Sequence, residues 1–369
     1  WSEGLGPFTP VVRDGKLYGR GCSDDGYSVY AALTAIRALE DAGIPHPRAV
    51  GLIETREESG SNDLEHYLKK NAARFGSPRL VCVLDSGAGN YEQLWLTSSL
   101  RGACAIDLNV RVLRQGMHSG TASGVVPSSF DVLRILLDRI QDPRTGAILD
   151  PAFNVEIPSN RMDDMKKTAE VLGDGFISEF PWAEGPNGSV QSRCRGTEEA
   201  LIARCWKPTL SVTGAAGLPP LSMAGNSLRS DTTLRLSFRL PPTAKTENIL
   251  PALQKKLLTD PPFNAVVSIA GGDALPGWNA PSEADWFRSA CDESSKALWG
   301  KPAMRIGEGG SIPILNLFEA QFPRAQFAVT GVLGPGSNAH NADESLDLAY
   351  TEKFIAAVGY LAASIPEEA

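Results

Sequence analysis

The spacing of apolar residues changes twice along this chain, and that change limits the folds open to it. Over 29–42 apolar residues recur with the period of a helix, and Gly43 follows as a natural helix terminator. Short apolar runs at 48–53 and 80–84 have the pattern of buried strands. Strands and helices that alternate at this spacing predict a parallel α/β sheet.

A period of two replaces this pattern in the middle of the chain. Residues 103–113 alternate like a half-exposed strand, and 234–240, Leu-Arg-Leu-Ser-Phe-Arg-Leu, alternate without a break. Helical periods at 128–140 and 247–258 accompany them. The middle stretch therefore predicts a separate α+β domain of antiparallel strands under helices. The segment 150–209, rich in Gly, Pro and Trp, gives no clear order of elements.

The first pattern continues on both sides of this stretch. A helix is predicted at 61–71 with Ser61 as its N-cap, another helix at 282–299, and an apolar strand at 325–332.

Length points the same way, because 369 residues exceed what one ordinary core organises. We predict an α/β domain, a mixed sheet with helices on both faces, from residues 1–100 and 277–369. An α+β domain from residues 101–276 is inserted into it.

Charge and composition exclude several partners. A formal charge of -8 and a pI near 5.2 argue against nucleic acid and anionic membranes, because phosphate binding needs a basic face. No apolar run is long enough for a membrane span. The six cysteines form no Cys-x-x-Cys pair, which fits reduced thiols and predicts a cytoplasmic protein.

A glycine-rich turn carries Asp24 and Asp25 between a predicted strand at 16–18 and the helix at 29–42. Its glycines allow a tight turn that leaves both carboxylates at the carboxyl edge of a sheet, where open α/β folds bind ligands. Taken alone, a solvated turn that caps the helix is the better interpretation. A phosphate-binding loop fits poorly, because adjacent carboxylates repel phosphate.

Glu57 and Glu58 follow the predicted strand at 48–53. Adjacent carboxylates at a strand end point in different directions, so one can bind a metal ion while the other faces water. Acids that favour the dipole of a following helix would alone explain the pair. Asp85 and His340, taken singly, would be a loop starter and a structural histidine.

The conjunction of these residues changes the interpretation. Three predicted strand ends and one late loop bring carboxylates and an imidazole to one edge of the sheet. Such an oxygen-rich set suits divalent metals such as zinc, cobalt or manganese.

Seven motifs occur in the order found in metallopeptidase family 20, which the chain resembles over nearly its whole length. They are Gly-Arg-Gly-x-x-Asp-Asp, Glu-Glu-x-Gly-Ser, an Asp after a strand, His-Ser-Gly, Ser-x-Arg-x-x-Pro, Gly-Glu-Gly-Gly-Ser-Ile-Pro and His-x-x-Asp-Glu. The family includes carnosinase-type dipeptidases, aminoacylases, glutamate carboxypeptidases, and acetylornithine and succinyl-diaminopimelate deacylases. The resemblance implies a zinc-peptidase-like catalytic domain and a ferredoxin-like inserted domain that serves as lid and dimer interface.

The resemblance also implies two divalent metal ions, zinc before cobalt or manganese. Asp24 would bridge the two ions, Glu58 and His340 would bind one, and Asp85 would bind the other. Glu57 would be the general base for the water between them.

Substrate contacts follow in the same way. His118 would hydrogen-bond the tetrahedral oxyanion, in relatives often across the interface of a homodimer formed by the inserted domain. Arg239 would clamp the substrate carboxylate. Further contacts to the substrate are implied for Asn226, Gly309, Gly310 and Ser311. On the residues alone, His118 fits a surface residue and Arg239 a solvent-facing partner of a carboxylate equally well.

Two features depart from the family pattern. The first metal ligand of the family comes from a His-x-Asp motif whose position falls before Trp1, so we expect upstream residues in the complete protein. Gly26-Tyr27 stand where many relatives carry Lys-Gly, which weakens the transfer of any particular substrate.

The leading hypothesis is a two-metal hydrolase that cleaves an amide bond next to a free carboxylate in a small peptide. A deacylase of N-acyl amino acids from the same family is the alternative. An inactive binding or scaffold protein is a third, against which the retention of both Glu57 and Glu58 argues. A thiol hydrolase is disfavoured, because no cysteine has the setting of a nucleophile.

Overall fold

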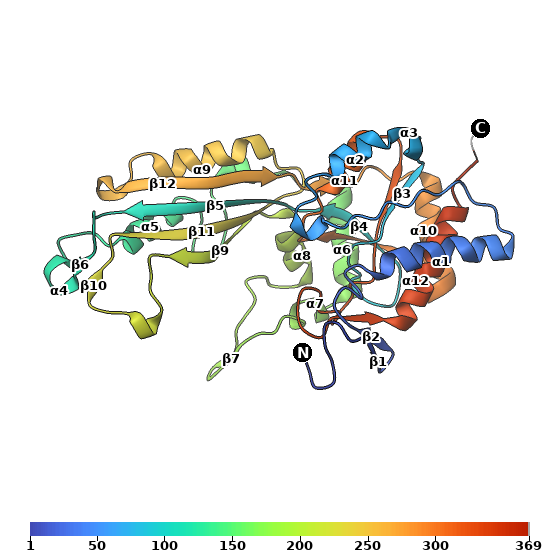
Figure 1. The fold of residues 1–369 in the computed structure, drawn as a ribbon, viewed down its shortest axis with the longest axis horizontal. Coiled ribbons are helices and arrows are strands. Elements are labelled where there is room, and N and C mark those ends of the chain that lie inside the picture. Colours follow the sequence, from blue (N-terminus) through green and yellow to red (C-terminus); the bar gives the residue numbers. More distant parts are fainter. Residues whose placement is uncertain (368–369) are drawn as a thin grey trace.

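The computed structural model, which describes residues 1–367, has an elongated sheet domain on one side and an α/β body on the other (Figure 1). The sheet domain, called the inserted domain below, has four antiparallel strands in the order β12-β5-β11-β9. These strands are β5 (Gly102–Arg111), β9 (Thr209–Ala216), β11 (Asp231–Leu240) and β12 (Val266–Leu275). The predicted antiparallel strands are therefore confirmed.

One face of this sheet forms a core with two helices, α5 (Ser129–Asp138) and α9 (Ile249–Leu258). Every second side chain of β5 and β11 is buried against them, as a period of two requires. The α5 helix begins where the Ser128 side chain accepts a hydrogen bond from the Phe130 N–H. At the far end of the domain lie β6 (Met117–His118), α4 (Ser119–Ala122) and β10 (Ser227–Leu228) (Figure 1).

The α/β body contains two parallel strand pairs that lie side by side. The pairs are β3 (Leu80–Val83) with β15 (Gln326–Val329), and β4 (Trp95–Leu100) with β14 (Met304–Glu308). The short β13 (Trp278–Asn279) adds an antiparallel partner to β4, so the arrangement is mixed. The surrounding helices are α1 (Tyr27–Ala42), α2 (Leu64–Lys70), α3 (Ala72–Phe75), α10 (Asp285–Trp299), α11 (Ile314–Gln321) and α12 (Leu348–Ala363).

The helix predicted at 29–42 is confirmed as α1, and Gly43 ends it in the left-handed conformation with φ of 66°. The run at 48–53 is not a strand, so that prediction was wrong. Its side chains at Val50, Leu52 and Ile53 are 37%, 39% and 66% exposed. A strand needs a neighbouring backbone for its N–H and C=O groups, and no strand of residues 1–367 pairs with this segment.

The predicted N-cap at Ser61 was also wrong. Helix α2 begins after Asp63, and Ser61 has a left-handed φ of 47° where an N-cap residue is extended.

The segment that sequence patterns left open contains α6 (Ser159–Leu172), α7 (Gly175–Ser178), the hairpin β7 (Glu184–Gly185) and β8 (Gly188–Ser189), and α8 (Thr197–Trp206). Helices α6 and α8 pack on β14, and their Met165, Leu201 and Trp206 share a core with Trp95 and Ile306 of the α/β body. Part of the middle stretch therefore stabilises the α/β body rather than the inserted sheet.

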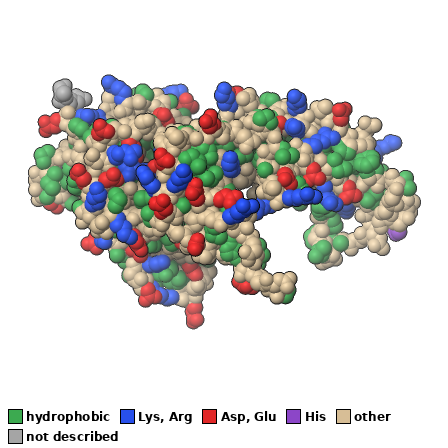
Figure 2. All heavy atoms as spheres, turned by 180° about the vertical axis from the view of Figure 1, so that it is seen from behind, with side chains coloured by type: hydrophobic (Ala, Val, Ile, Leu, Met, Phe, Trp, Pro, Cys, Tyr) green, Lys and Arg blue, Asp and Glu red, His purple; other side chains and the backbone are tan. Residues whose placement is uncertain are grey.

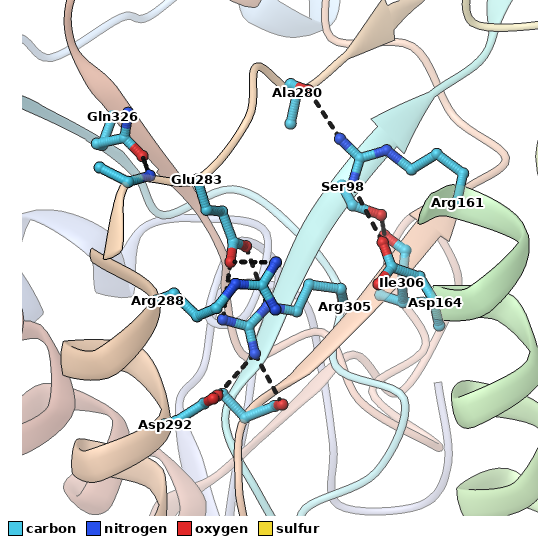
Figure 3. A network of polar contacts seen from close by, with 12 residues as sticks. Ser98, Arg161, Asp164, Ala280, Glu283, Arg288, Asp292, Arg305, Ile306 and Gln326 are labelled. Atoms are coloured by element: carbon cyan, nitrogen blue, oxygen red, sulfur yellow. Dashed lines mark hydrogen bonds and ion pairs between the residues drawn. The ribbon is translucent and has the colours of Figure 1, made fainter. Parts of the chain in front are cut away.

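Figure 3 shows a polar network that joins β14, α10 and the segment after β13. Arg305 of β14 donates to both carboxylate oxygens of Glu283 at 3.0 Å and to Asp292 at 2.7 Å. Arg161 of α6 donates to the Asn279 side chain at 2.8 Å and to the Ala280 carbonyl at 2.7 Å. The network ties α6 to the same region of the body.

We expect Arg305→Met to lower the free energy of unfolding by about 3 kcal/mol, because two largely buried carboxylates lose their partner. Arg288 pairs with the same Glu283, but its side chain is 56% exposed. Arg288→Met should therefore cost less than about 1 kcal/mol. Calorimetric unfolding of both variants measures the difference, and equal losses would contradict the importance of burial.

Among residues 1–367, none of the helices combines the length and apolar character needed to cross a bilayer. A hollow lies where the inserted domain meets the α/β body, and Lys and Arg side chains gather along its edge (Figure 2).

Candidate active site

The turn that carries Asp24 connects β2 (Lys16–Tyr18) to α1 and is held by one buried carboxylate. Glu344 is fully buried and accepts hydrogen bonds from the backbone N–H groups of Gly21, Ser23 and Asp24 at 3.0 to 3.2 Å. It also pairs with Arg20 at 2.9 Å. The late motif that contains His340 thus fixes the early turn that contains Asp24.

The sheet edge that positions this turn differs from the prediction. Strand β2 pairs antiparallel with β1 (Val11–Arg13) and β16 (Ser345–Asp347), so it lies outside the parallel pairs. The Tyr27 hydroxyl instead links the start of α1 to the Leu84 carbonyl at 2.6 Å. That bond brings the turn next to Asp85, which does follow the parallel strand β3 as predicted.

Three of the predicted metal ligands lie together. Nε2 of His340 lies 2.9 Å from Oδ2 of Asp24 and 2.9 Å from Oε1 of Glu58. One ligand atom from each residue falls within 4.8 Å of the other two. Glu58 comes from the short 3₁₀ turn Glu57–Ser59, and not from the end of a strand.

His340 reaches this position from a loop with unusual backbone angles. Asn338, His340 and Asp343 have φ of 54°, 63° and 60°, a region that residues other than glycine seldom adopt. Such conformations persist where the surrounding structure requires them, often at functional sites.

The carboxylates in this cluster disfavour one another's ionisation. Burial, followed by the charges of Asp25, Asp24 and Glu57, raises the pKa of Asp85 to about 7. Burial also raises the pKa of Asp24, although the charge of His340 opposes the shift. The pKa of Glu57 is raised by burial and by the nearby charges of Glu58 and Asp24. Several acids in one place therefore need a proton or a cation.

The donor set fits a divalent cation. Two carboxylates and an imidazole are ligands that zinc accepts, and His340 contacts both carboxylates without an intervening residue. Asp85 lies close enough to Asp24 for the charge of Asp24 to raise its pKa, so a further carboxylate stands near the cluster.

A second group of predicted residues surrounds the loop after β14. Arg239 of β11 donates to the Ser311 hydroxyl at 3.2 Å, and that hydroxyl donates to the carbonyl of Arg101 at 2.5 Å. A Cβ atom on Gly87 would lie 2.8 Å from Oε1 of Glu308, so the last residue of β14 touches the loop that carries Asp85. The residues just before Ser311 in sequence therefore lie beside the segment that follows Asp85.

His118 and Asn226 lie elsewhere. His118 is on β6, opposite Ser227 of β10, and its Nδ1 accepts the Gly120 N–H at 3.2 Å. The carbonyl of Asn226 accepts the Ser119 N–H at 2.9 Å. Strand β6, which carries His118, and β10, which follows Asn226, lie at the far end of the inserted domain, away from β2 and α1 (Figure 1).

Glu344 and Arg101 have structural positions that their sequence motifs did not predict. Glu344 belongs to the recognised His-x-x-Asp-Glu motif, and that membership was the available signal. Arg101 follows the fully buried strand β4, where a charged residue is unexpected, and this contrast could have identified it.

Two curated dipeptidases are similar to this chain over most of its length. A cysteinylglycine-S-conjugate dipeptidase of Corynebacterium striatum is 26% identical over 92% of this chain and 72% of its own length. A Cys-Gly metallodipeptidase of Schizosaccharomyces pombe is 27% identical over 93% of this chain and 71% of its own length.

The fold is also known. The solved structure of a Saccharomyces cerevisiae di-peptidase, Dug1p, matches with a TM-score of 0.76 at 23% identity, covering 99% of this chain and 76% of that one. This likeness confirms the predicted combination of a mixed α/β body with an inserted α+β domain. The model of peptidase family M20/M25/M40 matches residues 1–365, and the chain belongs to that family.

Proposed function

We propose that this protein is a metal-dependent hydrolase that cleaves dipeptides with a free carboxylate. The observation that carries the proposal is the cluster of Asp24, Glu58 and His340, and a second group, Arg239 bonded to Ser311, supports it. A cation site together with a site for a carboxylate suits hydrolysis of an amide bond near the end of a short peptide. The dipeptidases named above, which share the family, support this substrate class.

We propose two ions, with zinc before cobalt or manganese. Asp24, Glu58 and His340 would hold one, and Asp24 and Asp85 would contribute to the other. A divalent cation makes a nearby water more acidic and stabilises negative charge on the carbonyl oxygen.

Under this proposal, one group of side chains transfers protons and another binds the substrate carboxylate. Glu57 takes the proton of the attacking water and passes it to the departing amine. Arg239 and the loop Gly309, Gly310 and Ser311 hold the carboxylate and so fix the distance of the amide bond from Glu57.

A screen of substrates tests this function. The protein should cleave free dipeptides faster than N-acetyl or N-succinyl amino acids, as a dipeptidase would and a deacylase would not. Faster release of acetate or succinate would favour the deacylase alternative, and cleavage of neither class would contradict the proposal.

We further propose that the protein is a homodimer in which His118 and Asn226 of one subunit complete the active site of the other. The position of both residues at the far end of the inserted domain supports this arrangement (Figure 1).

Subunit mixing tests the dimer. His118→Ala and Glu57→Gln proteins should each be nearly inactive, because each lacks one group of every site. After the two are mixed and exchanged, about a quarter of wild-type activity should return, because each mixed dimer has one complete site. Lack of recovery despite confirmed exchange would contradict a site shared between subunits.

A further inference from the structure

Three arginine side chains surround the loop after β14. Arg101 follows β4, Arg204 belongs to α8 and Arg239 to β11. Only Arg204 forms an ion pair with a carboxylate in the described residues, at 3.4 Å from Glu308. Within residues 1–367, Arg101 and Arg239 have no such ion pair, so no direct carboxylate partner balances their two positive charges.

Of the two arginines that lack a carboxylate partner within residues 1–367, Arg101 is the more deeply buried. Its exposure is 9%, and its Nε donates to the Gly309 carbonyl at 3.1 Å. Its Nη1 donates to the Thr209 hydroxyl at 3.3 Å. Burial, and then the charges of Arg239 and Arg204, lower the pKa of Arg101 to about 10. The environment therefore disfavours its charge, and a bound anion would relieve that cost.

Two other buried arginines of the protein each pair with a carboxylate. Arg161 and Arg305, each 7% exposed, pair with Asp164 at 3.1 Å and with Asp292 at 2.7 Å. Charged side chains are seldom buried without such a partner. Within residues 1–367, Arg101 departs from this rule at the loop where a substrate carboxylate is proposed to bind.

The remaining nitrogen of Arg101, Nη2, has no protein partner among residues 1–367. A Cβ atom on Gly309 would lie 3.1 Å from this nitrogen. A larger side chain at position 309 would crowd this nitrogen, and glycine avoids that contact. The Ser311 hydroxyl, which donates to the Arg101 carbonyl and accepts from Arg239, ties the two arginines to one place.

We propose that Arg101 is a second guanidinium of the carboxylate site, so that the free carboxylate of the substrate lies between Arg101 and Arg239. This inference rests on the proposed function for the identity of the substrate. In this arrangement Arg101 binds and orients the substrate carboxylate, and it takes no part in proton transfer. The enzyme then selects peptides with a free carboxylate over the corresponding amides.

Arg101→Met tests the proposal, since methionine keeps much of the length and removes the charge. The substrates are the best dipeptide and the same dipeptide as its C-terminal amide. We expect KM for the free dipeptide to rise at least about tenfold with kcat little changed, because a charge-assisted contact to the carboxylate is lost. The kinetic constants for the amide should stay the same, and Arg101→Lys should restore part of the loss.

Arg139→Met is the matched control. Arg139 also bonds backbone carbonyls, those of Lys256, Thr259 and Asp260, but it lies in the inserted domain near α9. This variant should change neither substrate's KM. Equal losses for the free dipeptide and its amide in Arg101→Met would show a merely structural role and overturn the proposal.

A binding measurement separates this inference from the proposed function. In a Glu57→Gln background, calorimetry should show the free dipeptide bound at least about tenfold more weakly after Arg101→Met, and the amide bound equally. If the wild-type protein cleaves no dipeptide but this binding difference holds, the proposed function fails and the carboxylate site stands. If Arg101→Met leaves binding of the free dipeptide unchanged, the carboxylate site fails whatever the activity.

Discussion

Replacing Glu57 with glutamine should lower kcat by about a thousandfold while the protein keeps its metal ions. Glutamine has nearly the same shape but cannot take a proton from water. Glu57 lies close enough to Glu58 and Asp24 for their charges to raise its pKa, yet it is absent from the group of ligand atoms around His340. Steady-state kinetics and metal analysis of the same preparation measure both parts of this result.

Glu65→Gln is the control for the loss of a glutamate near this segment. Glu65 lies on α2, its side chain is 59% exposed, and it pairs with Lys69. This variant should keep full activity, because exposed pairs contribute little. If Glu57→Gln instead loses metal, Glu57 is a ligand and its assignment as the base is wrong.

Removal of divalent ions by a chelator should abolish activity and lower the unfolding temperature. The acids around Asp24 and Asp85 repel one another when ionised, so a cation that binds only the folded state stabilises it. At a thousand times its Kd, such an ion contributes about 4 kcal/mol. Activity and calorimetric unfolding should both recover when zinc, cobalt or manganese is returned.

Asp24→Asn provides the control for this experiment. Its unfolding temperature should respond far less to added metal, because the shared ligand has lost its charge. Activity that survives complete removal of metal would favour a thiol hydrolase, and a protein inactive with and without metal would favour the binding or scaffold alternative.

Elements with a clear period were predictable from sequence. The alternation over 234–240 and the helical period over 29–42 each reflect one buried face, and β11 and α1 cover these residues. The strand predicted at 48–53 was wrong, because apolar composition cannot reveal whether a neighbouring strand is present. The helices α6 and α8 were not predicted, because many glycines and prolines interrupt the segment that contains them.

Residue types in the site were easier to predict than their positions. Motifs identified Asp24, Glu58 and His340, which the structure brings together. They did not reveal that Glu344 holds the turn of Asp24, because that bond joins residues far apart in sequence and has no periodic signature. Arg101 follows a fully buried strand, which was a signal, but the absence of a carboxylate partner within residues 1–367 became visible only in the structure.

The bond between Arg239 and Ser311 has a consequence for motion. Arg239 belongs to a strand of the inserted domain, whereas Ser311 belongs to the loop after β14 of the α/β body. A ligand bound by both residues would hold the inserted domain and the α/β body together, and its release would allow the two to move apart. Release of the product and relative rotation of the halves would then be one event.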